Sequence, residues 1–297
     1  MVGFCCDASQ DLVHLDMVCS INGNILGTDD AHISISDLAL LRGYGVFDFF
    51  RVEDNVPLFI DDHIDRFYSS AEVLRLKIPF TKAKLKEHIL EIVLLNRLKF
   101  SGVRLLLTGG EAKDGYTPGK PNLIITQELV KRPDDSVYKA GVKLIKHEFE
   151  RELPQVKTTG YLTSIWLQNQ IAKAGAMDVI YCSKGLVAEL SRSSIFVVRA
   201  DGVVVTPGNN VLAGVTRKNV LEIAKNQYDI QLADVTLEDL DKAREVFITS
   251  TIKRIVPVVQ VEDKTYGEGI PGRITKALSD KLIDFETEYI DKHRLMV

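Results

Sequence analysis

The chain has little cysteine and no long apolar run, and each shortage excludes a class of protein. The four cysteines among 297 residues are Cys5, Cys6 and Cys19 near the N-terminus and the isolated Cys182. This spacing is typical neither of a disulfide framework nor of a metal-ligand set. No apolar run reaches the roughly 18–20 residues that a membrane-spanning helix needs. We therefore expect reduced thiols, no metal site, no membrane association and a cytoplasmic location.

The chain also lacks an excess of positive charge. Its 37 basic and 41 acidic residues give a formal net charge of −4, so there is no electrostatic reason to expect a nucleic-acid partner. The first 16 residues have no basic region followed by a long apolar region, which is not typical of a secretory signal. We predict an N-terminal extension over residues 1–16, for which disorder is one interpretation, and a folded chain that begins near Met17.

The first part of the folded chain predicts a small α+β domain over residues 17–131. Asn22-Gly23, between apolar runs, predicts a hairpin. Apolar residues near helical spacing predict a helix within residues 61–76, which Pro79 stops. Thr81 suits the N-cap of a second helix.

The second part of the chain predicts a larger domain. Residues 132–139 are polar, contain Pro133 and show no periodicity, so we predict a linker there. Residues 140–297 then alternate many short apolar strands with few helices. This pattern predicts a barrel-like domain, and the chain is long enough for two domains that each have their own core.

Two charged residues of the second part are candidates for chemistry at a cofactor. Lys157 lies between a loop marked by Pro154 and a predicted helix. A lysine that is kept partly unprotonated can form a Schiff base with a carbonyl group. Glu189 ends an otherwise apolar strand, and a buried carboxylate can hold the proton of a pyridine nitrogen. Taken alone, each residue also fits an ordinary solvated side chain.

Hydroxyl groups occur at positions suited to an anion. A glycine and Thr216 open a predicted helix, where backbone N–H groups and a hydroxyl can bind a phosphate. Ser250 and Thr251 end a buried strand and suit the same kind of ligand. A plain helix cap and an ordinary strand-end turn are the alternatives.

Three arginines have surroundings that suit a bound carboxylate or phosphate. Arg66 lies within the first predicted helix, Arg42 precedes the segment GYG, and Arg104 lies in an apolar strand. A guanidinium group binds such anions through two parallel hydrogen bonds. An exposed or edge position is the alternative for each arginine.

Six segments follow one another along the chain: RGYGVFD, DDHIDRFYSSAEVLRLKIPFTKAKL, VKTTGY, GLVAELSRSSIFVV, VLAGVTRKNVLEIA and VFITSTIKRIVPV. In this order they resemble the class IV aminotransferases, the fold type IV group of pyridoxal-phosphate (PLP) enzymes. That family includes D-amino acid aminotransferases, branched-chain aminotransferases and aminodeoxychorismate lyases. The resemblance extends from about Met17 to the end of the chain, and the helical segment is closest to the D-amino acid branch.

The resemblance implies a fold, a cofactor and roles for the candidates. Family members have a small α+β domain and a larger barrel-like α/β domain with PLP in the cleft between them. They are usually homodimers, in which a loop of the neighbouring small domain reaches each site. Lys157 would hold PLP as a Schiff base and move protons, Glu189 would pair with the pyridine nitrogen, and Tyr161 would touch the phenolic oxygen. The 5′-phosphate would be bound by Arg66, Val215, Thr216, Ser250 and Thr251.

The chain departs from the resemblance in two places. Residues 109–120 include neither the arginine nor the histidine with which D-amino acid enzymes bind the substrate α-carboxylate. Phe47 stands where the family often has a tyrosine. We therefore hypothesise that Arg104 and Arg42 bind this carboxylate, with Phe47 also part of the substrate site.

The resemblance implies transamination between an amino acid and a 2-keto acid, both small molecules. A D-amino acid donor is the first prediction, because of the helical segment. A branched-chain L-amino acid donor is an alternative that Arg104 favours. A 4-amino-4-deoxychorismate lyase is a further alternative, because residues 114–118 resemble that branch. A binding module without activity is disfavoured, because both Lys157 and Glu189 are present.

Overall fold

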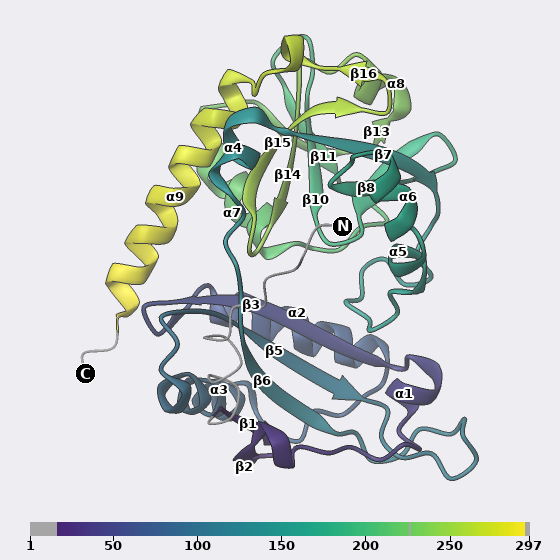
Figure 1. Cartoon of the computed structure of the whole chain (residues 1–297), viewed down its shortest axis with the longest axis vertical. Coiled ribbons are helices and arrows are strands. Elements are labelled where there is room, and N and C mark those ends of the chain that lie inside the picture. Colours follow the sequence, from purple (N-terminus) through teal and green to yellow (C-terminus); the bar gives the residue numbers. More distant parts are fainter. Residues whose placement is uncertain (1–16, 226, 295–297) are drawn as a thin grey trace, which may run out of the picture. The chain divides into compact units, whose positions relative to one another are not determined.

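The structure, a computed structural model, describes residues 17–225 and 227–294 and divides into two compact units (Figure 1). Unit 1 runs to Val130 and takes in Arg294, and unit 2 runs from Lys131 to His293. Unit 1 is an antiparallel sheet with helices packed on it, and unit 2 is a barrel-like sheet with helices outside it. The predicted α+β fold class, with a small domain and a larger barrel-like domain, is confirmed. The extension predicted over residues 1–16 lies outside the described residues.

The helices and strands of unit 1 are, in chain order, β1 (Val18–Ile21), β2 (Asn24–Gly27), η1 (Thr28–Asp30), α1 (Leu38–Arg42), β3 (Gly45–Glu53), β4 (Val56–Pro57), α2 (Ile60–Val73), α3 (Lys82–Asn96), β5 (Phe100–Thr108) and β6 (Leu123–Leu129). The sheet order is β2-β1-β6-β5-β3-β4. Val46, Asp48 and Phe50 alternate along β3 and are buried, as expected for one face of a strand. α2 packs on β3, with Ile64 and Phe67 buried at helical spacing.

Local sequence accounts for two of the turns and caps in unit 1. Asn22 and Gly23 both have positive φ, 56° and 90°, as a tight two-residue hairpin turn requires, and they join β1 to β2. The side chain of Thr81 accepts a hydrogen bond from the Lys84 amide at 3.2 Å and caps α3. The predicted hairpin and cap are therefore confirmed.

The helices and strands of unit 2 are, in chain order, α4 (Asp135–Ala140), β7 (Val142–Glu148), α5 (Leu162–Trp166), α6 (Gln168–Lys173), β8 (Asp178–Ser183), β9 (Leu186–Leu190), β10 (Ser194–Val198), β11 (Val204–Pro207), α7 (Val215–Ala224), β12 (Ile230–Ala233), β13 (Val235–Thr236), α8 (Leu237–Asp241), β14 (Glu245–Ser250), β15 (Arg254–Val261), β16 (Lys264–Thr265), η2 (Gly267–Gly269) and α9 (Arg273–His293).

The sheet of unit 2 closes on itself through one broken strand. Its order is β12-β11-β10-β14-β15-β7-β8-β9-β13. The two end strands, β12 and β13, are consecutive in the chain and are separated only by Asp234. β12 pairs in parallel with β11, and β13 pairs antiparallel with β9. The segment 230–236 therefore joins both edges of the sheet, which makes the barrel.

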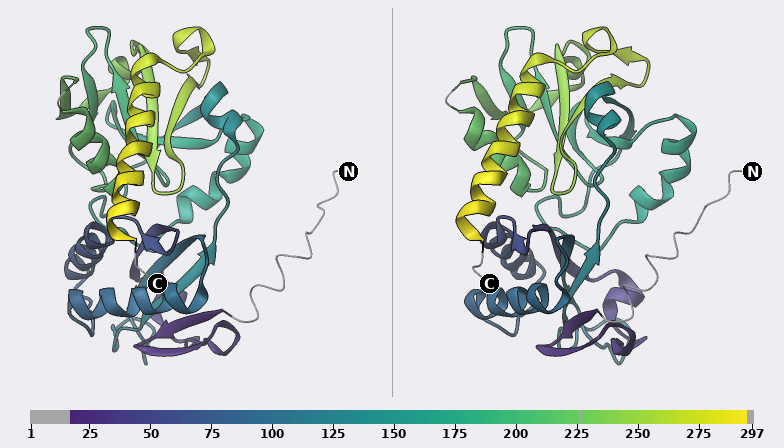
Figure 2. Two further views of the ribbon diagram at one scale, coloured as in Figure 1. Left: turned by 90° about the vertical axis from the view of Figure 1, so that its left-hand side faces the viewer. Right: turned by 60° about the vertical axis from the view of Figure 1, so that its left-hand side comes forward.

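The barrel has an inner and an outer apolar core. Branched side chains such as Leu144, Ile180 and Ile248 fill its interior. Phe196 and Phe247 stack outside it with ring centroids 4.7 Å apart and lie under α7 and α9. Figure 2 shows α9, in yellow, lying along the β14–β15 hairpin on which it packs. Within the described part of the chain, no helix combines the length and the apolarity that crossing a bilayer requires.

The stretch predicted as a linker, residues 132–139, contains most of α4. The Asp134 side chain accepts a hydrogen bond from the Ser136 amide at 2.8 Å and caps this helix. α4 packs on β15, and Tyr138 donates a hydrogen bond to the Lys253 carbonyl at 3.1 Å. The helix has only six residues, too few for a clear apolar period, which is why the sequence pattern did not indicate it.

The absence of a side chain at Gly102 leaves room for the ring of Phe49 on the neighbouring strand. A Cβ atom at Gly102 would lie 2.0 Å from Cζ of Phe49. We expect Gly102→Ala to lower the free energy of unfolding by about 1–3 kcal/mol, because the ring must leave its place on the sheet. Urea denaturation measures this change. Gly27→Ala is the matched control, since its Cβ would meet nothing closer than Asp30 Oδ2 at 3.5 Å. Equal effects of the two substitutions would contradict the steric explanation.

Candidate active site

Lys157 follows a loop that Arg151 holds in place. Arg151 donates from Nη2 to the carbonyl oxygens of Leu153, at 3.2 Å, and Val156. Val156 is fully buried and directly precedes Lys157. The loop that leads to Lys157 is therefore held by the buried side chain of Val156 and by the guanidinium group of Arg151.

Glu189, near the end of β9, is a buried carboxylate with two anchors. Its side chain is 7 % exposed. Oε1 accepts a hydrogen bond from Arg151 Nη1 at 2.8 Å, and Oε2 accepts one from the Leu212 amide at 3.2 Å. Burial raises the pKa of Glu189, while Arg151, the Leu212 amide and the charge of Lys157 act in the opposite direction. A carboxylate has about four acceptor positions, so two remain for a ligand.

Arg151 therefore connects the two residues that the sequence singled out. It bonds the carboxylate of Glu189 and the backbone of the loop that ends at Lys157. Lys157 is near enough to Glu189 to influence the pKa of the carboxyl group. Unit 2 thus places a lysine and a buried acid together, as a Schiff-base site with a pyridine partner requires.

The N-terminus of α7 is open to an anion. Its N-cap residue is Gly214, so no side chain caps the first N–H groups of the helix. Val215 is buried and Thr216 is half-buried in its first turn. A Cβ atom at Gly214 would lie 2.8 Å from Ser194 Oγ, so a larger residue would disturb this junction. The ten-residue helix offers backbone donors and a positive dipole end to a phosphate.

The second pair of predicted phosphate ligands lies close to this helix end. Ser194, which contacts Gly214, is the register partner of Thr249 on β14. Ser250 and Thr251 follow Thr249 directly, where β14 ends, and both are half-buried. The segments that carry Thr216, Ser250 and Thr251 therefore lie in one region of unit 2.

Tyr161 begins α5, four residues after Lys157. It is the N-cap residue of this helix, and its carbonyl accepts hydrogen bonds from the Ile165 amide at 3.0 Å and Ser164 Oγ at 3.1 Å. Its side chain is half-buried and lies near enough to Tyr181 to act on it electrostatically. The short helix thus fixes the backbone of Tyr161.

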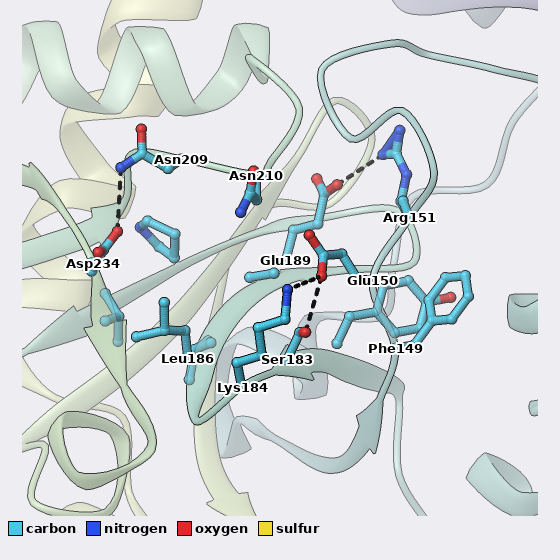
Figure 3. A pocket seen from close by; sticks show the side chains of 15 residues that line it. Phe149, Glu150, Arg151, Ser183, Lys184, Leu186, Glu189, Asn209, Asn210 and Asp234 are labelled. Atoms are coloured by element: carbon cyan, nitrogen blue, oxygen red, sulfur yellow. Dashed lines mark hydrogen bonds and ion pairs between the residues drawn. The ribbon is translucent and has the colours of Figure 1, made fainter.

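A small cavity adjoins the Arg151–Glu189 pair but does not suit PLP. Its volume is about 80 Å³, with Glu189, Arg151 and Tyr181 among the lining residues, and Lys157 and Thr216 are not among them. Ligand pockets of cofactor size are usually several hundred Å³. Figure 3 shows the pair of Glu189 and Arg151 beside a second cluster, in which Lys184 and Ser183 contact Glu150. The cavity has room for a few water molecules that reach Glu189 from this side.

The donor set of unit 2 nevertheless fits PLP. A buried carboxylate suits the pyridine nitrogen, an uncapped helix end suits the phosphate, and a lysine near the acid suits the aldehyde. The residues that supply these groups are Glu189, Val215, Thr216 and Lys157.

In unit 1, Arg66 is held by a buried carboxylate. Arg66 donates from Nε to Asp48 Oδ2 and from Nη2 to Asp48 Oδ1, each at 2.8 Å. His63 Nδ1 lies 2.7 Å from the same Oδ1. Burial alone would raise the pKa of Asp48, but the charges and hydrogen bonds of Arg66 and His63 outweigh it and hold this pKa far below its usual range. The guanidinium group of Arg66 is thus fixed in orientation.

The two arginines proposed for the substrate carboxylate differ in their surroundings. Arg104 donates from Nη2 to Glu128 at 2.6 Å, and its guanidinium group lies over the rings of Phe47 and Phe49, with centroid distances of 5.8 and 5.0 Å. Arg42 is exposed and donates to the Leu41 carbonyl at the end of α1. Arg104 is therefore preorganised on an aromatic surface, whereas Arg42 lies on the outside of unit 1.

Three residues that contact the candidates or their segments were not named from the sequence. Arg151 binds Glu189, Asp48 binds Arg66, and the buried Arg217 donates to the Leu212 carbonyl at 3.3 Å. Arg217 could have been noticed from the sequence, because a cation in the first turn of a predicted helix is unfavourable next to the positive end of the helix dipole. An isolated aspartate in the apolar strand VFDFF was another.

Comparisons with known proteins identify the family of the chain. Residues 45–261 match the family described as "Amino-transferase class IV". The chain is 33% identical to a Methanocaldococcus jannaschii protein assigned by name to the branched-chain-amino-acid aminotransferases, over 91% of this chain and 96% of that one. It is 28% identical to a Bacillus licheniformis D-alanine aminotransferase, over 88% and 94%. The structure of the T.th. branched-chain amino acid aminotransferase with pyridoxamine 5′-phosphate superposes with a TM-score of 0.86 at 27% identity, covering 93% and 97%.

The shared carboxylate of Asp48 provides a prediction for unit 1. We expect Asp48→Asn to destabilise the protein by roughly 3–5 kcal/mol at pH 7, because it leaves the mostly buried guanidinium group of Arg66 without its counter-charge. The folded-state pKa of Asp48 lies below its unfolded value of about 4. The stability that its charge contributes is therefore fully present above about pH 4 and is lost as the pH falls from there towards the folded-state pKa.

Urea denaturation at several pH values tests this expectation. The deficit of Asp48→Asn relative to wild type should be largest near neutral pH and should shrink below about pH 4. Asp65→Asn is the control, because Asp65 pairs with Lys82 on the exposed surface. A deficit that is the same from about pH 7 to about pH 3 would contradict the assigned role of the Asp48 charge.

Proposed function

The chain belongs to the class IV aminotransferase family, and on this premise we propose that it transfers the amino group of an amino acid, first of all a D-amino acid, to a 2-keto acid. It is a PLP-dependent aminotransferase. The observation that carries the assignment of the site is the buried Glu189 carboxylate, which Arg151 and the Leu212 amide hold and which lies near Lys157. Bound PLP supplies an aldehyde and an aromatic ring that accepts electrons.

The residues of the chain have distinct tasks in this proposal. Glu189 would hold the proton of the ring nitrogen, with Arg151 and the Leu212 amide keeping its carboxylate in place. Lys157 would hold the cofactor through its aldehyde, and its amine, once the substrate amine has displaced it, would carry the proton of the substrate Cα. Thr216, Ser250 and Thr251, with the first N–H groups of α7, bind the phosphate, and Arg66 and Tyr161 complete the set proposed for the cofactor.

Two classes of donor have support from specific observations. The segment HIDRFYSSAE, within α2, resembles the D-amino acid branch, and D-alanine aminotransferases are among the relatives. Arg104 on the rings of Phe47 and Phe49, together with the M. jannaschii relative, favours a branched-chain L-amino acid. For either donor we propose that Arg104 and Arg42 bind the α-carboxylate, with Phe47 in contact with the substrate.

We also propose that the active enzyme is a homodimer in the cytosol. α5 exposes three apolar side chains immediately after the Lys157 loop: Leu162 is 83% exposed, Ile165 62% and Trp166 69%. A contiguous apolar patch of this kind on a folded protein marks an interaction surface. Cys19 and Cys182 are free and buried, which suits a reducing compartment.

The visible spectrum of the purified protein tests the function. We expect an absorption band of PLP bound to lysine, which D-alanine removes in the absence of any keto acid because the amino group moves to the cofactor. Bleaching by L-leucine alone would assign the enzyme to branched-chain donors instead. A band that neither donor changes, together with product release that needs no keto acid, would favour the lyase.

Variants at two lysines make this test specific. Lys157→Ala should lose the band and reduce the rate by at least about a hundredfold, since it removes both the covalent link and the proton carrier. Lys173→Ala, at an exposed position of α6, should keep both. A Lys157→Ala protein that still shows the band would contradict the assignment of Lys157.

The exposed face of α5 provides the prediction for the dimer. Wild type should elute as a dimer in size-exclusion chromatography with light scattering, and Trp166→Glu should shift the population towards the monomer because it places a charge in an apolar interface. Leu232→Glu, at a 57% exposed position of β12, is the control and should remain dimeric. A monomeric wild-type protein would refute the proposed assembly.

A further inference from the structure

Arg217 occupies a position that is unfavourable for a cation. It lies in the first turn of α7, where the helix dipole is positive, and it is only 8% exposed. The dipole alone opposes a cation there, and burial of the charge opposes it by more. Burial lowers the pKa of Arg217, and the Glu189 carboxylate counteracts this effect. The charge of Glu189 therefore compensates for the placement of Arg217.

The backbone of Leu212 connects the side chains of Arg217 and Glu189. Arg217 Nη1 donates to the Leu212 carbonyl at 3.3 Å, and the Gly214 amide donates to the same oxygen at 2.9 Å. The amide of Leu212 in turn donates to Glu189 Oε2 at 3.2 Å. Leu212 is thus fixed at its carbonyl by α7 and at its amide by β9.

Charged groups surround Glu189 from several elements. The loop before α5 contributes Arg151, in direct contact, and Lys157, while α7 contributes Arg217. Glu150, Lys184 and Asp234 line the adjoining cavity, where Glu150 pairs with Lys184. Arg151 anchors one oxygen of the carboxylate directly. The other oxygen depends on Leu212, whose position depends on Arg217.

We propose that Arg217 is a positioning residue for Glu189, which fixes the Leu212–Gly214 segment and favours the ionised carboxylate that the cofactor's ring nitrogen requires. The inference rests on the proposed function, because it assigns a task to Glu189. Without Arg217, the Leu212 amide is free to leave Oε2, and a buried carboxylate with one anchor takes up a proton more readily. A protonated Glu189 no longer holds the proton of the ring nitrogen, so catalysis weakens although the substrate contacts remain.

The first test uses the cofactor-free protein and needs no activity. The Glu189 pKa is raised on folding, so its contribution to stability falls as the pH rises through the folded-state pKa. Arg217→Met should raise that pKa further. The urea concentration at the unfolding midpoint should therefore fall further below that of wild type at about pH 8 than at about pH 5. A loss that is independent of pH would show a merely structural role and overturn the proposal.

The second test uses the loaded enzyme and separates kcat from KM. Arg217→Met should lower kcat by about a hundredfold with little change in the KM of the donor, because the substitution displaces Glu189 but leaves the contacts to the substrate intact. The visible band should also titrate at a different pH. Arg217→Lys keeps the charge without the planar fork and should recover part of kcat.

A matched control and a contrary outcome complete the design. Arg199 pairs with Asp239 at 3.1 Å elsewhere in unit 2, so Arg199→Met should show neither the pH-dependent loss nor the fall in kcat. If Arg217 instead bound the cofactor's phosphate, Arg217→Met would weaken PLP binding, Arg217→Lys would restore it, and the cofactor-free protein would show no pH-dependent difference. That pattern would overturn the proposal. Absence of a visible band in wild type would reject the proposed function, while the cofactor-free test would still decide the link between Arg217 and Glu189.

Discussion

The buried carboxylate of Glu189 is the constraint on which the rest of unit 2 depends. A charge that is almost fully removed from water persists only where donors and opposite charges surround it. The chain provides them from three separate places: Arg151 before the Lys157 loop, the Leu212 amide before α7, and Arg217 within α7. Each of these segments also carries or adjoins a residue assigned to the cofactor. The need to compensate one charge therefore ties the Lys157 loop, β9 and the start of α7 to one another.

The sequence was sufficient for the parts of the fold and site that depend on local patterns. Asn22-Gly23 and Thr81 acted as turn and cap because their effects extend over only three or four residues. Lys157, Glu189 and Thr216 were named because they stand in recognisable segments. Their roles remain proposals, although the structure brings Lys157 and Glu189 together.

The remaining features depend on pairs that are distant in the chain. Arg151 and Glu189 are 38 residues apart, and Arg66 is 18 residues from Asp48. No local pattern states which carboxylate an arginine will meet, because that is decided by strand register and helix placement. Glu128 likewise meets Arg104 because β5 and β6 are neighbours in the sheet. This contact partly neutralises Arg104, which the apolar surroundings in the sequence did not indicate.

The closure of the barrel limits the order in which the two domains can fold while the chain is being synthesised. β7, which precedes the Lys157 loop, has as one neighbour β15, which lies far later in the chain, and the segment 230–236 must be present before β9 and β11 are joined. In unit 1, by contrast, the sheet is complete at Leu129. On the ribosome, the first domain can fold while the second is still being made. Lys157 and Glu189 then remain in an open sheet until the strands near the end of the chain are made. Any chain released early therefore carries Lys157 without a closed barrel around it.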